Sequence, residues 1–248
     1  MPNPRYSRNV WLRLAILSTI FLFAQSRWSL AGDDWQLYPG APEISDAEEI
    51  EMGRRADEYI RHQFYLETDP DITAAVNAIL QRLVTVCERN NLPFTCNVIQ
   101  SYSINAFSVP GGHIYLTCGL LRFAETEDEV AGIVGHEIAH ASLRHASKLY
   151  HETMALLSRR ENGGRSAAPL MLLSNHLEDL EQEADSRGVL YAHKAGFNPN
   201  GLPDFLERHL GLIVNNEWFR LLGFGSVSSV NTRINRLREY IPTMEKGK

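Results

Sequence analysis

The chain has 248 residues, with 24 lysines and arginines against 30 aspartates and glutamates, for a formal net charge of −6. This length is enough for one large domain or two small ones with a sizeable core. The acidic balance, without a basic stripe, argues against nucleic-acid binding and against simple electrostatic attraction to anionic lipids. We therefore expect no nucleic-acid partner, while peripheral membrane association stays open.

Residues 1–31 have the features of a secretory signal peptide. Three arginines give them a positive start, namely Arg5, Arg8 and Arg13. A short apolar run follows from Leu14 to Ala24, and Ser29-Leu30-Ala31 ends in the small-x-small pattern of a cleavage site. The run is shorter than the roughly 20 residues that a membrane-spanning helix needs. We expect an exported protein, periplasmic if the source is Gram-negative; the alternative is an uncleaved membrane anchor.

Two helices are expected before the first strand. Ser45 and Glu48 form a capping box that begins a helix ending near Phe64. Asp69-Pro70 supplies the cap and the first-turn proline of the next helix. The apolar residues of that second helix recur at helical spacing, namely Ile72, Val76, Ile79, Leu80 and Leu83.

Three short strands are predicted in the middle of the chain, at residues 97–102, 106–109 and 113–117. Pro110-Gly111-Gly112 is expected to turn the chain between the last two. Helical patterns dominate the rest of the sequence. The sequence thus predicts an α+β fold that is mostly helical, with a small β-sheet.

The chain has three cysteines, and an exported protein can form disulfides. Cys87 ends a helical pattern and Cys96 begins a strand pattern, with a tight link between them. We predict a bridge between Cys87 and Cys96. Cys118 is expected to be a small buried residue.

His136 and His140 stand four residues apart and would project from one face of a helix. That spacing suits two nitrogen ligands on one Zn²⁺, and Glu137 could act as the general base for a water at the metal. A capping box at Thr126–Glu129 marks the start of this helix. The alternative is an amphipathic helix with two histidines that bind nothing.

A catalytic zinc site needs a third protein ligand. Glu181 and Asp185 are again four apart and would share a helix face. Glu181 could bind the metal, and Asp185 could accept a hydrogen bond from the second nitrogen of a ligating histidine. Glu183 lies on another side of the helix, so it cannot face the metal together with Glu181. A solvated acidic helix is the alternative.

Taken together, these motifs resemble family forty-eight of the metallopeptidases. His136–His140 is followed by Ser142-Leu143-Arg144-His145 and then by Glu181–Asp185, as in that family. Four further segments match in order, namely Ile104–Phe107, Pro110–Tyr115, Gly119–Leu121 and Ala195–Pro199. The resemblance implies a zincin-like (gluzincin) metalloprotease fold, as a single domain over residues 32–248.

The resemblance also implies roles for individual residues. One Zn²⁺ per chain would be held by His136, His140 and Glu181, with Glu137 as the base and Asp185 behind the ligands. A strand edge beside the metal helix would pair with an extended polypeptide substrate. The residues implied for that edge are Asn105, Ala106, Phe107 and Val109. A plain sheet packed on the helix is the alternative.

Two features near the C-terminal half qualify the resemblance. The family commonly has a His-Pro pair about six residues before an arginine; here the arginine is Arg233, and Val227 stands at the histidine's position. The histidine's roles would then fall to Arg233, to water or to nothing. Arg233 could alternatively pair with Asp185 or cap the helix of Glu181. Residues 148–165 could form a lid or an ordinary surface connection.

We therefore expect a zinc-dependent endopeptidase that cuts unfolded or misfolded exported proteins, with Glu137 activating the water. The alternative is a chaperone-like or assembly factor that keeps the zinc site without proteolysis.

Overall fold

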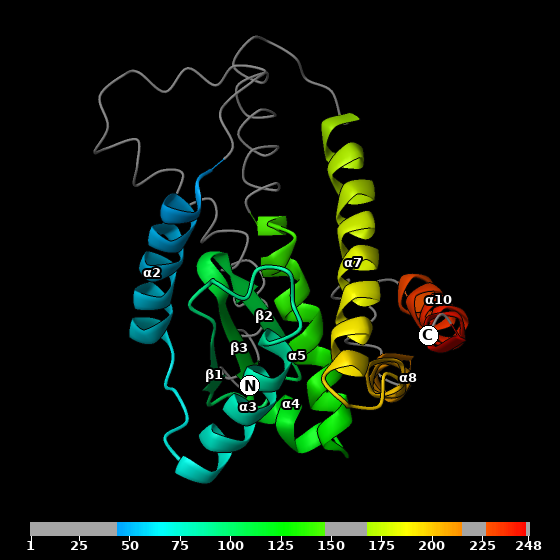
Figure 1. Ribbon diagram of the computed structural model, residues 1–248, viewed down its shortest axis with the longest axis horizontal. Helices are drawn as coiled ribbons and strands as arrows, with labels where there is room; N and C mark the ends of the chain where they lie inside the picture. Colours follow the sequence, from blue (N-terminus) through cyan, green and yellow to red (C-terminus); the bar gives the residue numbers. More distant parts are fainter. Residues whose placement is uncertain (1–43, 147–167, 215–226, 247–248) are drawn as a thin grey trace, which may run out of the picture.

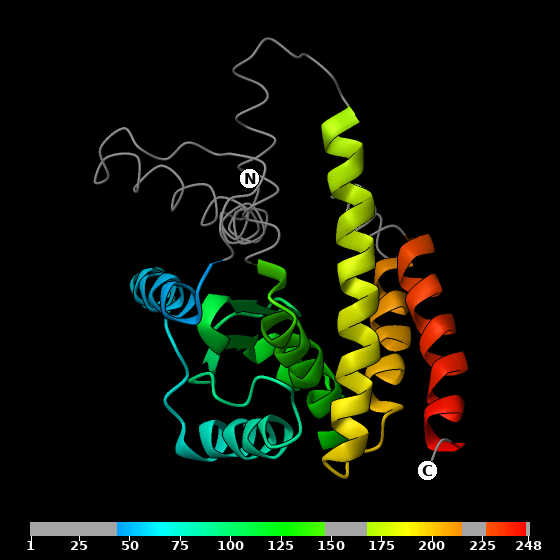
Figure 2. The same ribbon diagram turned by 45° about the horizontal axis from the view of Figure 1, so that its top comes forward.

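The computed structural model describes residues 44–146, 168–214 and 227–246, arranged as helices on both sides of a three-stranded sheet (Figure 1). Helix α2 (Asp46–Gln63) covers one face of the sheet, and α3 (Pro70–Val84) and α5 (Glu127–Ser142) cover the other. Beyond α5 lie α7 (Ala168–Lys194), α8 (Gly201–Val214) and α10 (Val227–Lys246), as Figure 2 shows. The prediction of a mostly helical α+β fold is confirmed.

The first two helices begin where their capping residues predict. Before α2, the Glu48 amide donates to the Ser45 hydroxyl, and the Ser45 amide donates to the Glu48 carboxylate at 3.0 Å. Asp69 accepts from the Asp71 amide at 2.9 Å, and Pro70 is the first residue of α3. Local capping chemistry therefore determines both starts.

The sheet consists of β1 (Thr95–Ile99), β2 (Ala106–Val109) and β3 (His113–Thr117) in the order β1-β3-β2. Strand β1 is parallel to the central strand β3, and β2 is antiparallel to it. The bounds predicted for β2 and β3 are confirmed, and Pro110–Gly112 forms a 3₁₀ turn between them.

The first strand lies earlier in the chain than predicted, beginning at Thr95 and ending at Ile99. Thr95 pairs with His113 of β3, and its hydroxyl contacts the ring Nδ1 of His113 at 2.9 Å. At the other end the Gln100 amide donates to the carbonyl of Tyr65 instead of continuing the pairing with β3. Contacts with other segments of the chain set these bounds. The local sequence pattern does not reveal those partners.

The two outer edges of the sheet differ. The segment around residues 65–67 pairs with β1, since the Glu67 amide donates to the Val98 carbonyl at 2.8 Å and Leu66 bridges to Ile99. Within the described ranges, the outer edge of β2 has no such strand beside it.

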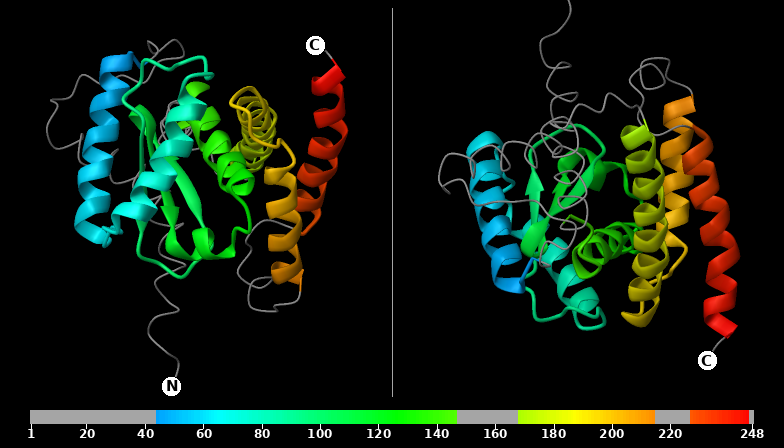
Figure 3. Two further views of the ribbon diagram at one scale, coloured as in Figure 1. Left: turned by 60° about the horizontal axis from the view of Figure 1, so that its bottom comes forward. Right: turned by 90° about the horizontal axis from the view of Figure 1, so that it is seen from above.

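The view from below shows α2, α3, α5, α7, α8 and α10 following one another across the molecule (Figure 3).

Helix α5 lies at the centre of the molecule and is buried almost all round, with sheet and α3 on one side and α7 and α8 on the other. Its predicted start is confirmed, because the Thr126 hydroxyl accepts from the Glu129 amide. A helix that is covered on several sides holds its polar residues rigidly, which suits a site.

The predicted disulfide between Cys87 and Cys96 is wrong, because both cysteines are free buried thiols. Cys87 follows α3, in contact with Ser142 at the end of α5. Cys96 points from β1 into the core between the sheet and the helices α3 and α5. Burial there raises the pKa of its thiol to about 12. The tight link does not bring the two sulfurs together. Cys118 is buried, as predicted.

After α5, the described part of the chain forms the helices α7, α8 and α10, as the helical patterns in the rest of the sequence predict. No helix in the described ranges is both long and apolar enough to span a membrane. The predicted signal peptide at residues 1–31 and the segment 148–165 lie outside the described residues.

Candidate metal centre

The centre is built where α5 crosses α7. Gly135 of α5 faces Gly188 of α7, and a β-carbon on Gly135 would lie 2.8 Å from the Gly188 carbonyl oxygen. Because both residues are glycines, the two helix backbones lie closer together than they could with a larger residue at either position. This approach places Glu181, two turns before the crossing on α7, opposite the histidines of α5.

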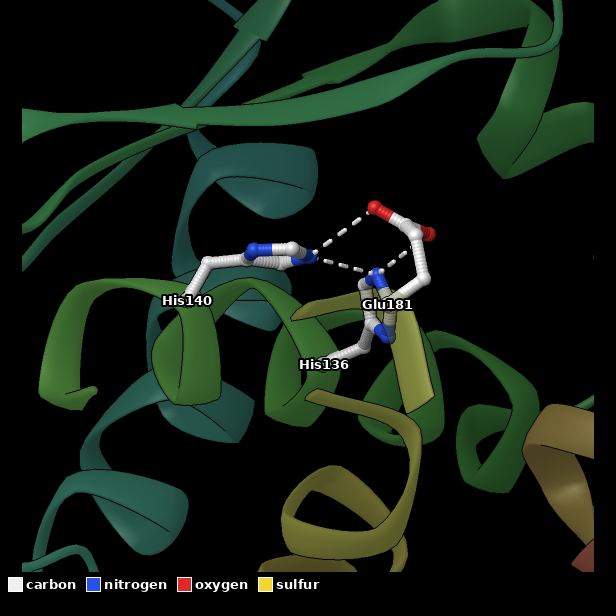
Figure 4. Close-up of side chains that lie close together, drawn as sticks. All are labelled: His136, His140 and Glu181. Atoms are coloured by element: carbon white, nitrogen blue, oxygen red, sulfur yellow. Dashed lines mark hydrogen bonds and ion pairs between the residues drawn. The ribbon is translucent and has the colours of Figure 1, made fainter. Parts of the chain in front are cut away.

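His136, His140 and Glu181 converge on one point (Figure 4). The Nε2 atoms of the two histidines are 3.0 Å apart. Glu181 Oε1 lies 3.4 Å from His140 Nε2, and Oε2 lies 3.6 Å from His136 Nε2. In the described part of the chain, these are the three side chains that come close enough together to hold a metal ion.

The spacing fits a tetrahedral zinc ion. Ligand atoms at about 2.0–2.1 Å from zinc in a tetrahedron are about 3.3 Å from one another. The three measured separations, from 3.0 to 3.6 Å, lie around that value. Two imidazoles and one carboxylate form the donor set of a catalytic zinc centre, which leaves the fourth position for water or substrate.

Electrostatics favour the form of Glu181 that binds a metal. Burial raises its pKa, but the hydrogen bond with His140 and the charges of His136 and Arg233 together hold the pKa far below its ordinary value. Burial lowers the pKa of His136, and the nearby carboxylates of Asp185 and Glu181 raise it overall. The triad thus combines an ionised carboxylate with two imidazole nitrogens, a donor set that suits a divalent cation.

Glu137 lies next to the triad and is buried, with 7 % of its surface exposed. The Ser108 hydroxyl of β2 donates a hydrogen bond to Glu137 Oε2 at 2.9 Å. The carboxylate is thus held between the metal helix and the edge strand. A fixed carboxylate in that position can accept a proton from a water bound in the fourth position.

Behind the triad, the buried Asp185 pairs with Arg233, which is partly exposed. Arg233 donates from Nε and Nη2 to the two Asp185 oxygens, both at 2.7 Å, and its Nη1 lies 3.1 Å from Glu181 Oε2. Asp185 Oδ1 is also 3.0 Å from His136 Nδ1. The predicted pairing of Arg233 with Asp185 is observed, and a catalytic role for Arg233 stays a prediction. Burial raises the pKa of Asp185, but Arg233 and His136 lower it overall.

The predicted substrate residues divide into two groups. Phe107 and Val109 point away from the centre into the core against α2, where Phe107 stacks on Tyr115 at 5.1 Å between ring centroids. Asn105 and Ala106 are partly exposed. The side chains of Phe107 and Val109 are therefore unable to bind substrate, and only their backbone could do so.

Three residues at the centre were not assigned a role from the sequence, namely Ser108, Gly188 and His145. Strand alternation could have placed Ser108 on the face opposite Phe107 and Val109. Glycine in a helix interior costs stability, so Gly188 in the motif helix could have indicated close packing. No local pattern marks the partner of His145.

A buried carboxylate beside two histidines and a glutamate that converge on one point is the arrangement expected of a metallopeptidase. A model of the family described as Peptidase family M48 matches residues 70–241. The chain belongs to this family, which confirms the family expected from its motifs.

Several curated relatives share the matched region. The beta-barrel assembly-enhancing protease of Escherichia coli (strain K12) is 27% identical over 187 residues, which cover 67% of this chain and 38% of that protein. The putative beta-barrel assembly-enhancing protease of Vibrio cholerae is 32% identical over 160 residues, covering 56% and 33%. The mitochondrial metalloendopeptidase OMA1 of Schizosaccharomyces pombe is 28% identical over 181 residues, covering 68% and 53%. The chain thus spans between a third and about half of the length of these relatives.

Proposed function

We propose that the chain is a zinc-dependent metalloendopeptidase with a zincin-like (gluzincin) fold. The observation that carries the proposal is the position of Glu137, buried beside the three ligands and oriented by Ser108. A structural zinc site is usually closed by four protein ligands, whereas here three converge within the described residues. A base next to an open position suits hydrolysis.

Zinc, when bound, polarises a peptide carbonyl and acidifies water. The chain's own residues do the rest. His136, His140 and Glu181 hold the ion, and Glu137 accepts the proton of the water that attacks the carbonyl carbon. As the carbon–nitrogen bond breaks, Glu137 returns that proton to the leaving amine. Asp185, held by Arg233, orients the ring of His136.

We propose that β2 binds the substrate by adding an extended segment to the sheet. Its outer edge has no strand beside it in the described ranges, and Ser108 of the same strand contacts the base. Main-chain pairing carries little sequence specificity, so many unfolded segments could bind. The backbone of residues 105–109 would supply this edge.

The proposed substrates are unfolded or misfolded exported proteins, in keeping with the sequence of residues 1–31 and with a relative named as a beta-barrel assembly-enhancing protease. We therefore propose an exported protein, periplasmic if the source is Gram-negative, that acts in quality control of the cell envelope. A peripheral contact with the membrane is compatible with such a role.

The test is degradation of casein, an unfolded protein, by the purified chain with added zinc. We expect cleavage that a chelator abolishes and zinc restores. The matched variant Glu137→Gln keeps the size of the side chain and removes the base. It should bind one zinc ion per chain and cut about 10²–10⁴-fold more slowly, which is the usual contribution of a general base.

The zinc content of both proteins is measured in the same samples. Cleavage that survives chelation or Glu137→Gln would contradict the proposal. A protein that binds zinc, cuts nothing and suppresses aggregation of an unfolded client would support the chaperone-like alternative instead.

A further inference from the structure

We infer that His145 is a positioning residue that holds His140 in the orientation and tautomer needed to bind the metal. The inference rests on the proposed metal centre and adds a residue to it. His145 lies three residues beyond the end of α5 and is 3 % exposed. It is neither one of the three proposed metal ligands nor the proposed base.

The contacts of His145 form a chain from the metal ligand to α7. His145 Nδ1 is 2.9 Å from His140 Nδ1, and its Nε2 is 3.2 Å from Glu183 Oε2. The planes of the two imidazoles are nearly perpendicular, at 81°. His145 therefore bridges the back of a ligand and a carboxylate on the neighbouring helix.

Proton positions along this chain follow from the metal site. His140 presents Nε2 to the other ligands, so its Nδ1 carries the proton when the ring is neutral. His145 must then accept at Nδ1 and carry its own proton on Nε2, which it donates to Glu183. Each hydrogen bond selects one tautomer of the next ring, and the chain ends on an acceptor-only carboxylate.

The backbone is shaped to deliver His145. Arg144 has φ of +57°, a left-handed conformation that is uncommon for residues other than glycine. Its guanidinium donates to the Ile44 carbonyl at 2.6 Å and to Asp46 at the start of α2. These contacts anchor the Arg144 side chain at the start of α2. The left-handed backbone at Arg144 turns the polypeptide back, and this places His145 beside His140.

Carboxylates of α7 thus contact both histidine ligands, one directly and the other through His145. Asp185 lies 3.0 Å from Nδ1 of His136 directly, and Glu183 reaches Nδ1 of His140 through His145. Glu183 points away from the metal, as its position on the helix predicts, yet it still acts on the centre. Carboxylate partners of this kind keep ligating imidazoles oriented, and their loss typically lowers metal affinity about 10–100-fold.

Two amide variants separate the two contacts of His145. In His145→Asn the amide oxygen takes the place of Nδ1 and can accept from His140, but the side chain is too short to reach Glu183. In His145→Gln the amide extends towards the place of Nε2, so the contact with Glu183 is kept and the acceptor for His140 is lost. The two variants are similarly polar, and thermal unfolding of the metal-free proteins shows whether both are folded.

The readout is zinc affinity, measured by competition with a chromogenic chelator. We expect His145→Asn to bind zinc within about threefold of the unmodified chain, and His145→Gln to bind about 10–100-fold more weakly. Equal affinities of the two variants, whether both unchanged or both weakened, would overturn the inference. The inference would also be overturned if a lower melting temperature of metal-free His145→Gln fully explained its loss of zinc affinity.

This readout needs no proteolysis, so the inference and the proposed function fail separately. A chain that binds zinc as described and digests no protein loses the enzymatic proposal and keeps the role of His145. A chain that binds no zinc loses both.

Discussion

Gly188 on α7 lies so close to α5 that a β-carbon at Gly188 would be 2.6 Å from the amide nitrogen of His136. The same contact brings the helix that carries Glu181 against the helix that carries the two histidines. The separation of two backbones therefore sets the geometry of the metal centre.

We expect Gly188→Ala to push the two helices apart and move Glu181 away from His136 and His140. Overpacking of this kind costs about 1–3 kcal/mol in the free energy of unfolding. Zinc affinity should fall several-fold as well, because the third ligand is displaced. Chemical denaturation and zinc competition measure the two effects.

The control is Gly211→Ala on the exposed side of α8, where a β-carbon would have no atom of the described residues within 4 Å. Alanine is the better helix former, so this variant should gain about 0.5–1 kcal/mol and bind zinc normally. Normal zinc affinity in Gly188→Ala would show that the crossing distance does not control the centre.

The Asp185–Arg233 pair gives a prediction about coupling. Arg233→Met leaves the buried Asp185 carboxylate without its main partner and should cost about 2–4 kcal/mol, somewhat less than a fully buried pair because Arg233 is partly exposed. Adding Asp185→Asn removes the uncompensated charge and should recover part of that loss. Urea denaturation of the metal-free single and double variants measures the coupling. Simple additivity of the two single effects would contradict it.

Ser108 is predicted to orient the base without binding the metal. Loss of its hydrogen bond in Ser108→Ala should lower kcat about 3–10-fold, the effect of one ordinary hydrogen bond. KM and zinc affinity should stay the same. Ser108→Thr keeps a hydroxyl and is the matched control. A change in KM with constant kcat would instead assign Ser108 to substrate binding.

Stability in acid should depend on Asp57, far from the metal centre. Burial raises the pKa of Asp57, but hydrogen bonds from Arg61 and Tyr115 together lower it below its ordinary 3.8. A lowered folded-state pKa stabilises the fold at pH values above 3.8, and this stabilisation is lost as the pH falls from 3.8 through the folded-state pKa. In Asp57→Asn the free energy of unfolding should decline less steeply in that range. Identical pH slopes in urea denaturation would contradict the assignment.

Much of the fold could be predicted from the sequence because its signals are local. Ser45 with Glu48, Asp69-Pro70 and Thr126 each begin a helix through contacts within a few residues. The strands at 106–109 and 113–117 follow from a turn of proline and glycines. The first strand was misplaced because its bounds depend on partners distant in the chain, among them Tyr65 and His113.

The cysteines show the same limit. A short link between Cys87 and Cys96 made a bridge plausible, but closeness in sequence does not fix the direction of two side chains. Packing of Cys87 against the end of α5, and of Cys96 below the sheet, keeps the two thiols apart and reduced.

By itself the sequence determined that His136 and His140 share a helix face with Glu137 beside them, since the period of the α-helix places them there in any fold that keeps the helix. It also placed Glu181 and Asp185 on one face of a second helix. Only the tertiary structure decided how these faces meet, because that depends on the approach of two backbones at Gly135 and Gly188. The contacts of Ser108 with Glu137 and of His145 with His140 likewise exist only after the strand and the turn beyond α5 have packed against the metal helix.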